Sequence, residues 1–462
     1  MPVSISRRQF LQGCSAAIAA MAGSRLTRVA LAQGAVNQDI LVAVFLRGAW
    51  DVLNVLPPLA GADRGYYEDA RRSYLRVPVS GAGAALPLGT LDCVPFGLHP
   101  SMAPLLNLYQ SRHIAFVHAC GMNHGTRSHF DAMQFMEMGT PGQVAGSGWI
   151  TRHLQTATNL PPVLQLPALA ANSSQPTSLL AYPDAVAMSG PSAFRFNGST
   201  SSFAGQTYSY WQQQSLRQMY TGASWLDRAG LETLDTLAVV QSAGSYTPAN
   251  GAAYPSGSFG SSLQTVAQMI KLNVGVQVAT IDFGGWDTHE YQGASTGYMA
   301  GLLDQLARGL AAFYTDLSGS GASDYIRRTT VVVMSEFGRR LRENRSQGSD
   351  HGHGSAMIVM GGQVNGGRLY GRWPGLRNDQ LFDGADLAVT TDYRAVLSEI
   401  LVRRLGNGAL DQVFPGLTSY LPLGIVQGTD VPVSLTPAPP PPPRVNLGYE
   451  TFLPAVNRGC AP

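Results

Sequence analysis

The sequence TVVVMSEFGRRLRENRSQGSDHGHGSAMIVMGG, residues 330–362, carries the clearest signal for the fold. It begins within a run of β-branched and apolar residues, 329–334, that has the composition of a buried strand. A second apolar run follows at residues 356–360, and a polar segment containing glycines separates the two runs. The stretch therefore predicts two core strands joined by a long polar loop.

That loop carries residues of the kind that bind metals. Its first polar cluster is headed by Glu336 and Arg339, and the motif DHGHG at residues 350–354 then places His351 and His353 beside a carboxylate. Imidazole and carboxylate groups together are ligands of zinc, iron or manganese, and the glycines let the backbone bend closely around an ion. A solvated loop with two incidental histidines is the alternative interpretation.

Two other predicted strands are followed by the same kinds of residue. The run ILVAVFL at residues 40–46 precedes Asp51, and the apolar run at residues 274–281 precedes Asp287 and His289. Unalternating apolar runs suit the strands of a parallel sheet covered on both faces, and ligands bind at the carboxyl edge of such sheets. In an extended segment Asp287 and His289 leave the same face, so they can hold one ion. A lone Asp after a strand, such as Asp51, is more often a turn or helix-capping residue than a ligand.

A candidate nucleophile follows a fourth predicted strand. Residues 113–120 form this strand, and residues 121–133 form a turn that opens a helix. A hydroxyl at a helix start is either a cap or a nucleophile, and the free N–H groups and helix dipole there favour phosphate or sulfate. Ser128 is the first choice for the nucleophile and Thr126 the second, with Arg127 adding a charge-assisted fork to the anion. Three histidines lie in this region: His118, His124 and His129. His118 lies on the apolar strand, so it is also explained as a core residue.

The whole pattern predicts an α/β fold in which a mostly parallel sheet is covered by helices. Helical spacing is found at residues 261–272, 299–317 and 391–405. Residues 160–255 predict an insertion of helices and loops that covers the sheet edge as a lid or specificity element. The proline content of residues 426–462 predicts that they form a C-terminal tail. No dinucleotide fingerprint or phosphate-binding P-loop is present in the sequence.

The N-terminal segment predicts export. SRRQFL at residues 6–11 is followed by an alanine-rich apolar stretch and then by ALA at residues 30–32, which is the order of a twin-arginine signal peptide. We therefore expect a signal over residues 1–32, recognition by the twin-arginine export machinery, and a periplasmic or secreted domain over residues 33–425. A basic N-terminal arm is the alternative. No other segment has about 18 consecutive apolar residues, so we expect no integral membrane segment after cleavage.

Charge and cysteine content narrow the function classes. Removing residues 1–32 takes away four arginines and no acids, so 31 basic residues become 27 against 29 acidic residues. A mature charge of about −2 without a basic stretch argues against nucleic acid as a partner. Three cysteines remain, an odd number that permits at most one disulfide in an oxidising compartment, and the sequence does not choose the pair: Cys93, Cys120 and Cys460.

Several short blocks of the chain carry a family resemblance. They are FLRGAWD at 45–51, RSHFDA at 127–132, GW at 148–149, GWDTH at 285–289, SEFGR at 335–339, DHGHG at 350–354 and TDYR at 391–394. Together they resemble the signature blocks of a large family of twin-arginine-exported proteins of unknown function. That family is placed within the alkaline phosphatase and sulfatase superfamily, and the blocks span nearly the whole predicted mature chain.

The resemblance implies a parallel sheet between helices and a centre of one or two divalent ions (zinc, manganese, calcium or iron). On the superfamily pattern Asp51 and Glu336 hold the ion next to the nucleophile, Ser128 or Thr126. The second ion is held by a further set: Asp287, His289, and His351 or His353. The sequence departs from the pattern where Glu336-Phe337 replaces the usual Asp-His pair and where Asp287-x-His289 is tighter than the usual spacing.

Three functions are compatible with these observations. The leading hypothesis is an exported metal-dependent hydrolase of small anionic esters, phosphate or sulfate. The replacement of the usual Asp-His pair by Glu336-Phe337 motivates the second hypothesis, a non-catalytic binding or assembly protein of the cell envelope that keeps the fold. The third hypothesis is another metalloenzyme such as a phosphotransferase or mutase, because one fold hosts several chemistries.

Overall fold

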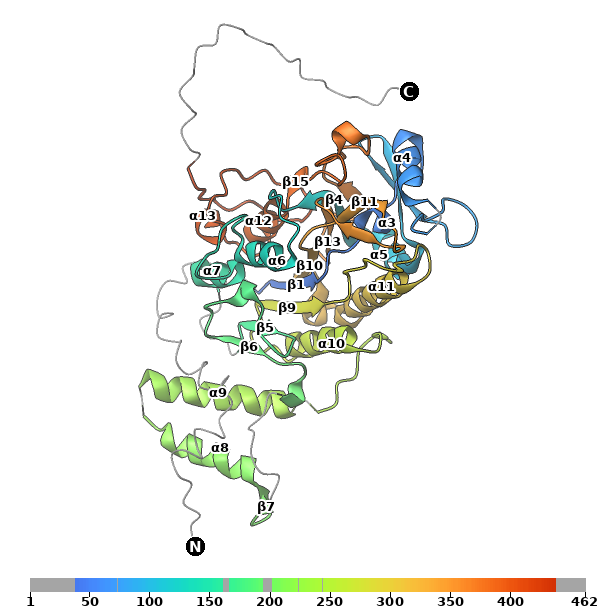
Figure 1. Ribbon diagram of the computed structural model, residues 1–462. Coiled ribbons are helices and arrows are strands. Elements are labelled where there is room, and N and C mark those ends of the chain that lie inside the picture. The colour runs from blue at the N-terminus through green and yellow to red at the C-terminus, as the bar shows by residue number, and fades with distance from the viewer. Residues whose placement is uncertain are drawn as a thin grey trace.

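A nine-stranded sheet forms the centre of the chain (Figure 1). The computed structural model describes residues 38–437 apart from residues 73, 161–165, 194–201, 223 and 243, so the predicted signal, the proline run and Cys460 lie outside the described residues. In spatial order the strands are β14 (Leu369–Tyr370), β4 (Ile114–Gly121), β13 (Ser355–Gly361), β10 (Thr329–Ser335), β1 (Ile40–Leu46), β9 (Val278–Phe283), β5 (Ala168–Ala170) and β6 (Ala185–Ala187), and β15 (Thr391–Asp392) pairs with β4.

The sheet is mostly parallel, as predicted. Strand β13 runs antiparallel to β10 and β4, and the remaining pairs in this sheet are parallel. Strand β1 lies between β10 and β9, with Leu46 in register with Ser335 on one side and with Phe283 on the other. The carboxyl ends of these three strands are therefore level with one another, and the segments that follow them leave the sheet at one edge.

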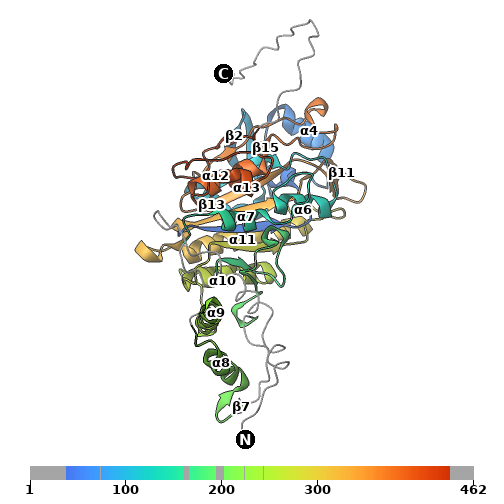
Figure 2. The same ribbon diagram turned by 90° about the vertical axis from the view of Figure 1, so that its left-hand side faces the viewer.

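Helices cover both faces of the sheet (Figure 2). On one face lie α10 (Ser258–Lys271) and α11 (Tyr298–Leu317), and on the other lie α6 (His129–Met138), α7 (Trp149–Thr156), α12 (Tyr393–Arg403) and α13 (Leu410–Val413). Val42 and Val44 of β1 belong to the first core, whereas Leu41 and Ala43 belong to the second. Because both faces of β1 are buried, its sequence has no polar alternation.

The smaller elements surround this sandwich. They are α3 (Val52–Val55), α4 (Gly61–Arg71), the hairpin of β2 (Leu86–Leu91) and β3 (Val94–Leu98), α5 (Leu106–Gln110), and the pair β11 (Arg339–Glu343) and β12 (Ser349–His351). The 3-10 turns are η2 (Pro100–Leu105), η3 (Thr177–Leu179), η4 (Pro191–Ala193), η5 (Gly321–Ser323), η6 (Tyr325–Arg328) and η7 (Asn378–Gln380). Among the residues the structure describes, no helix has the length and apolar character that a membrane crossing requires.

Part of residues 160–255, the range predicted to cover the sheet edge, belongs to the sheet itself. Strands β5 and β6 fall within this range and extend the sheet beyond β9, so they are the edge itself. The short strands β7 (Ser202–Phe203) and β8 (Gln206–Thr207) lead into α8 (Tyr208–Met219), and α9 (Trp225–Ser242) follows. In Figures 1 and 2 α8 and α9 lie beyond α10, at the opposite end of the molecule from α4.

The C-terminal side of the described chain packs onto the domain. Val426 is buried, and Val431, Val433 and Leu435 contact the core that contains α12 and α13. Residues 426–437 of the predicted tail thus lie against the body. Among the cysteines, Cys93 is disulfide-bonded and Cys120 is free and buried, which excludes Cys120 from the pair.

His118 is a core residue, the simpler of its two interpretations. Its ring is fully buried between Phe96 and Trp373, with ring centroids at 5.0 and 4.7 Å. Nδ1 accepts a hydrogen bond from the backbone N–H of Ala119 at 2.8 Å, so Nε2 carries the proton and donates to the carbonyl of Leu56 at 3.3 Å. Burial lowers the pKa of His118 to about 4, which keeps the ring neutral near pH 7.

This buried ring makes stability depend on pH. Unfolding lets the imidazole of His118 take up a proton at its ordinary pKa of 6.5, whereas the folded protein resists protonation until about pH 4. The stabilisation is therefore complete above pH 6.5 and is lost as the pH falls toward 4, and it amounts to about 3 kcal/mol. We expect denaturant titrations at pH 7 and 4.5 to show a smaller loss of unfolding free energy for His118→Gln than for wild type. Equal losses in the two proteins would contradict the assignment.

Candidate metal centre

The aligned ends of β1, β9 and β10 bring three sequence blocks together. Gly48 follows β1 with φ of 119°, and a Cβ at this position would lie 2.5 Å from the backbone nitrogen of Asp287. Only glycine allows the two segments to approach so closely. Glu336 follows β10 and accepts a hydrogen bond from the backbone N–H of Gly48 at 2.8 Å. The loop after β1 thus connects the block of Asp287 to the block of Glu336.

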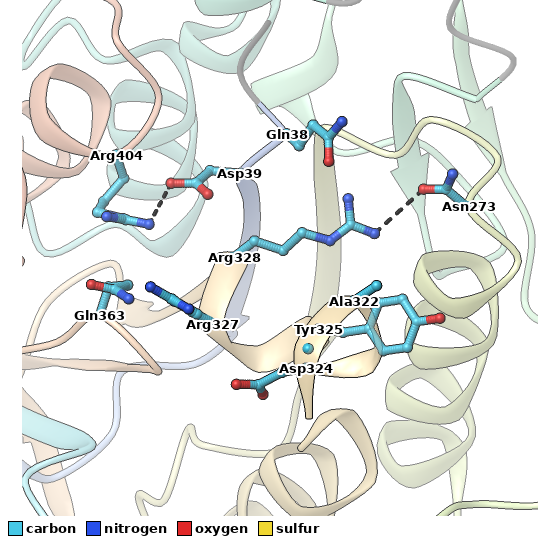
Figure 3. Close-up of a pocket in the computed structure, with 11 residues that line it drawn as sticks. Gln38, Asp39, Asn273, Ala322, Asp324, Tyr325, Arg327, Arg328, Gln363 and Arg404 are labelled. Atoms are coloured by element: carbon cyan, nitrogen blue, oxygen red, sulfur yellow. Dashed lines mark hydrogen bonds and ion pairs between the residues drawn. The ribbon is translucent and has the colours of Figure 1, made fainter. Parts of the chain in front are cut away.

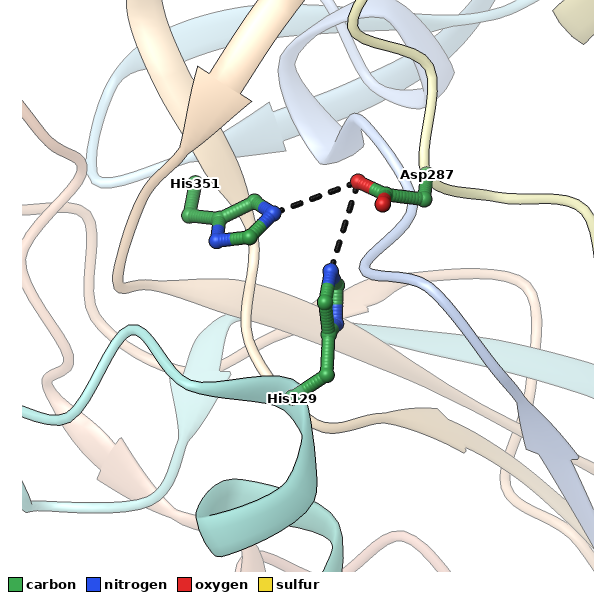
Figure 4. Close-up of side chains that lie close together, drawn as sticks. All are labelled: His129, Asp287 and His351. Carbon is green, nitrogen blue, oxygen red and sulfur yellow. Dashed lines mark hydrogen bonds and ion pairs between the residues drawn. The ribbon is translucent and has the colours of Figure 1, made fainter.

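Asp287 lies at the centre of a group of imidazoles (Figure 4). His129 begins α6, His351 ends β12, and together with Asp287 they offer ligand atoms that all lie within 4.8 Å of one another. The Nε2 atoms of His129 and His351 are 3.3 and 3.2 Å from Asp287 Oδ1. His289 Nε2 is 3.0 Å from the same oxygen and 2.8 Å from His351 Nε2. Three ring nitrogens therefore converge on one carboxylate oxygen.

Each of these rings has an acceptor next to its other nitrogen. Nδ1 of His129 lies 2.7 Å from Glu336 Oε1, and Nδ1 of His351 lies 2.8 Å from the carbonyl oxygen of Arg127. Nδ1 of His289 lies 3.3 Å from Asp350 Oδ1. An acceptor at Nδ1 favours a proton there, which leaves the lone pair on Nε2. Carboxylate or carbonyl groups of this kind orient most metal-binding histidines. The three Nε2 lone pairs accordingly point toward Asp287.

A divalent ion fits this arrangement. His129 Nε2 is buried and makes no hydrogen bond, which is costly unless another group binds it. The carboxylates in contact with the rings are those of Asp287, Glu336 and Asp350, and the guanidinium of Arg339 contacts Asp287. With neutral imidazoles, these three carboxylates and one guanidinium have a formal charge of −2. Imidazole nitrogens with a carboxylate form a donor set for zinc, iron or manganese.

The pKa shifts follow from the same contacts. Burial alone would lower the pKa of His129, but the hydrogen bond with Glu336 and the negative charges of Glu336 and Asp287 outweigh burial and raise it. For Asp287 burial would raise the pKa, and the neighbouring Arg339 guanidinium overcomes that effect and holds it below its usual range. Burial lowers the pKa of His351. Because this pKa is raised, a proton competes with a metal ion for the ring of His129 more strongly than it does at an ordinary imidazole.

Two predicted ligands lie outside this group. The carboxylate of Asp51 forms a salt bridge with Arg71, in which both side chains are fully buried, and it also accepts from Gln292 Nε2 at 2.7 Å. His353 stacks on Phe382 with ring centroids 3.9 Å apart, and burial lowers its pKa to about 4. Both residues are near the predicted edge of the sheet, but other side chains bind or cover them.

The three predicted catalytic residues lie immediately before His129. Ser128 is the N-cap of α6, and its Oγ accepts from the backbone N–H of Asp131 at 3.4 Å. Thr126 Oγ1 accepts from the backbone N–H of Ser128 at 3.2 Å. The guanidinium of Arg127 pairs with Asp386 at 2.5 Å and with Asp383 at 3.0 Å. Both hydroxyls thus belong to the segment that leads into His129, and each accepts a local hydrogen bond from the backbone.

His129 itself was not among the predicted ligands. It belongs to the block RSHFDA and follows the preferred nucleophile, and the cluster of histidines in residues 118–129 was the available signal. Its role depends on Glu336, which is far away in the chain and holds its Nδ1. Sequence spacing alone contains no information about this pair. Asp350, which positions His289, was noted within its motif but was not chosen.

A separate cavity lies at the opposite edge of the sheet (Figure 3). Its volume is about 750 Å³, and its lining includes Asp39 just before β1 and Arg327 and Arg328 just before β10. The amino ends of these strands are remote from the carboxyl ends that carry the centre. None of the residues around Asp287 lines this cavity.

Comparison with solved structures gives weak similarities. The crystal structure of Ps i-CgsB is 12% identical over 73% of this chain and 68% of that chain, with a TM-score of 0.30. A TAB5 alkaline phosphatase mutant with bound magnesium is 10% identical over 71% of this chain and 91% of that chain, with a TM-score of 0.24. Both scores are too low to support a shared site.

The family assignment comes from the sequence. No curated protein gives a significant match to this chain. Residues 38–406, which include every residue of the centre, match the family described as "Protein of unknown function (DUF1501)". The chain therefore belongs to this family of proteins of unknown function.

Proposed function

We propose that the protein is an exported metal-dependent hydrolase of phosphate or sulfate esters. The observation that carries the proposal is the convergence of three imidazole Nε2 atoms, within 3.3 Å, on Asp287 Oδ1. His129, Asp287 and His351 would hold the ion, and His289 is close enough to join them. A bound divalent ion would polarise an ester oxygen and promote ionisation of a nearby hydroxyl or water.

The residues before His129 supply the remaining chemistry in this proposal. Ser128 is the preferred nucleophile because it directly precedes a metal-binding residue at the start of α6, and Thr126 is the second choice. The free N–H groups of that helix end favour a tetrahedral anion. Arg127 adds positive charge, although Asp383 and Asp386 neutralise part of it.

Export is the second part of the proposal. The paired arginines, apolar stretch and small-residue cleavage site in residues 1–32 support the twin-arginine route. This route exports folded chains, so a centre built from distant parts of the chain would be assembled before export. We therefore propose a periplasmic or secreted location.

A non-catalytic envelope protein is the competing function, and one observation favours it. Ser128 caps α6, Thr126 accepts a backbone hydrogen bond, and Arg127 is engaged by two aspartates. Each residue chosen for catalysis thus already has a structural partner. Such a protein would bind the ion but would not turn over esters.

Turnover of aryl esters distinguishes the two functions. The periplasmic fraction of an expressing host and the purified protein are assayed with p-nitrophenyl phosphate and p-nitrophenyl sulfate. We expect hydrolysis of one of them, its loss on treatment with a chelator, and recovery on addition of Mn²⁺ or Zn²⁺. Ser128→Ala should lower kcat by about 1,000-fold or more, as loss of a nucleophile does in other hydrolases, while Ser128→Thr retains part of the activity. Bound metal without turnover of either ester would contradict the hydrolase and would fit both the non-catalytic protein and another metalloenzyme.

A further inference from the structure

Arg339 is a fully buried charge beside the proposed metal centre. It begins β11, and its side chain is 0% exposed, whereas that of Asp287 is 47% exposed. Its Nη2 donates to Asp287 Oδ1 at 2.5 Å. An arginine this deeply buried is stable only when its donors are matched by acceptors.

Backbone oxygens from several segments surround this guanidinium. Nε donates to the carbonyl of Ala49 at 2.9 Å, and Nη1 donates to that of Ser349 at 2.8 Å. Nη2 also lies 3.2 Å from the carbonyls of Gly48 and Trp286. Four carbonyls and one carboxylate therefore face one positive group. A shell of carbonyl and carboxylate oxygens is what a hard cation requires, and here the chain supplies the charge from its own side chain.

The carboxylates that a second ion would need are bound by other groups. Asp51 is held by Arg71 and by Gln292. Glu336 Oε1 accepts from Gly48 N–H at 2.8 Å and faces His129 Nδ1 at 2.7 Å, while its Oε2 accepts from the hydroxyl of Ser335 at 2.9 Å. Among the described residues, neither carboxylate belongs to a group of ligand atoms that could hold a second ion.

We propose that Arg339 takes the place of a second cation, so that the centre binds a single divalent ion. The proposal rests on the metal centre of the proposed function and specifies its composition. Arg339 is a positioning residue, because all of its contacts are with the protein. Its permanent charge neutralises one side of Asp287 and so limits the net negative charge that attracts an ion.

Metal stoichiometry tests the proposal directly. The purified wild-type protein is stripped with chelator, dialysed against excess Mn²⁺ and then against buffer, and its metal content is measured by plasma mass spectrometry. We expect one Mn²⁺ per chain. Two ions per chain, both removed by His351→Ala, would overturn the role of Arg339 but leave the metal centre standing. No bound ion would remove the metal centre and this proposal together.

A pair of variants separates charge from structure. Arg339→Lys and Arg339→Gln both lose most of the hydrogen bonds to the carbonyls, but only the glutamine variant loses the charge. Isothermal titration with Mn²⁺ is expected to give a Kd within about threefold of wild type for Arg339→Lys and at least tenfold tighter binding for Arg339→Gln. A purely structural role predicts weaker binding in both variants, and that result would overturn the proposal. Circular dichroism establishes that each variant is folded, and the wild-type stoichiometry decides the question if either is not.

Discussion

Asp287→Asn is expected to weaken the binding of Mn²⁺ by more than about 100-fold, because even the loss of a group that only orients a ligand costs about 10- to 100-fold. Asp287 Oδ1 lies within 3.3 Å of the Nε2 atoms of His129, His289 and His351, so it is the one oxygen that all three rings share. The asparagine variant keeps an oxygen that accepts from Arg339 but lacks the negative charge. Isothermal titration at pH 7.5 measures the change, and His351→Ala should produce a loss of similar size.

The control for this prediction is His124→Ala. His124 belongs to the same segment of the chain as His129, but its ring packs edge-on against Phe135 and its Nδ1 accepts from the backbone N–H of Thr126. Its removal should leave the Kd for Mn²⁺ unchanged. If Asp287→Asn and His351→Ala bind Mn²⁺ as tightly as His124→Ala does, neither residue is a ligand.

The same centre should lose affinity in acid. Glu336 and Asp287 together overcome burial and raise the pKa of His129, so a proton competes with the ion at this ring more strongly than at an ordinary imidazole. As the pH falls through and below the raised pKa of His129, the proton competes better and the Kd increases. Isothermal titration with Mn²⁺ at several pH values measures this change, and a Kd that does not rise in acid would contradict the assignment of His129.

The strands could be predicted from the sequence because a strand that is buried on both faces consists of apolar residues without polar alternation. The runs at residues 40–46 and 329–334 are apolar throughout, and they are β1 and β10 of the sheet. The antiparallel direction of β13 could not be predicted in this way, since a strand buried on both faces has the same composition in either direction. Strands β5 and β6 have three residues each, which is too short for a periodic signal.

The grouping of the site could be predicted only in part. Asp287 and His351 were expected together because both belong to blocks near the carboxyl edge of the sheet, and they do lie together. No motif in the sequence of α4 marks Arg71 as part of the site, yet its guanidinium binds the carboxylate of Asp51. Spacing shows which side chains reach the edge of a sheet. It does not show which of them another side chain will neutralise there.

Arg71→Met is expected to lower the free energy of unfolding by about 3–5 kcal/mol, the usual cost of breaking a buried ion pair. Arg71 and Asp51 are both 0% exposed, and removing the guanidinium leaves the carboxylate of Asp51 with Gln292 as its remaining side-chain partner. The double variant Arg71→Met, Asp51→Leu removes both charges, so it should recover most of the lost stability. Urea denaturation of the three proteins measures these differences.

Bound metal in the same variants decides the role of Asp51. Sequence comparison with the superfamily pattern made it a ligand, whereas in the structure its oxygens accept from Arg71 and Gln292. If the ion pair is structural, the folded double variant and Asp51→Asn will bind one Mn²⁺ with the wild-type Kd. If Asp51 were a ligand, both would lose metal while Arg71→Met, which frees a carboxylate, would gain affinity. The two roles therefore predict different Kd values for Mn²⁺ in these variants, so metal binding separates them without reference to stability.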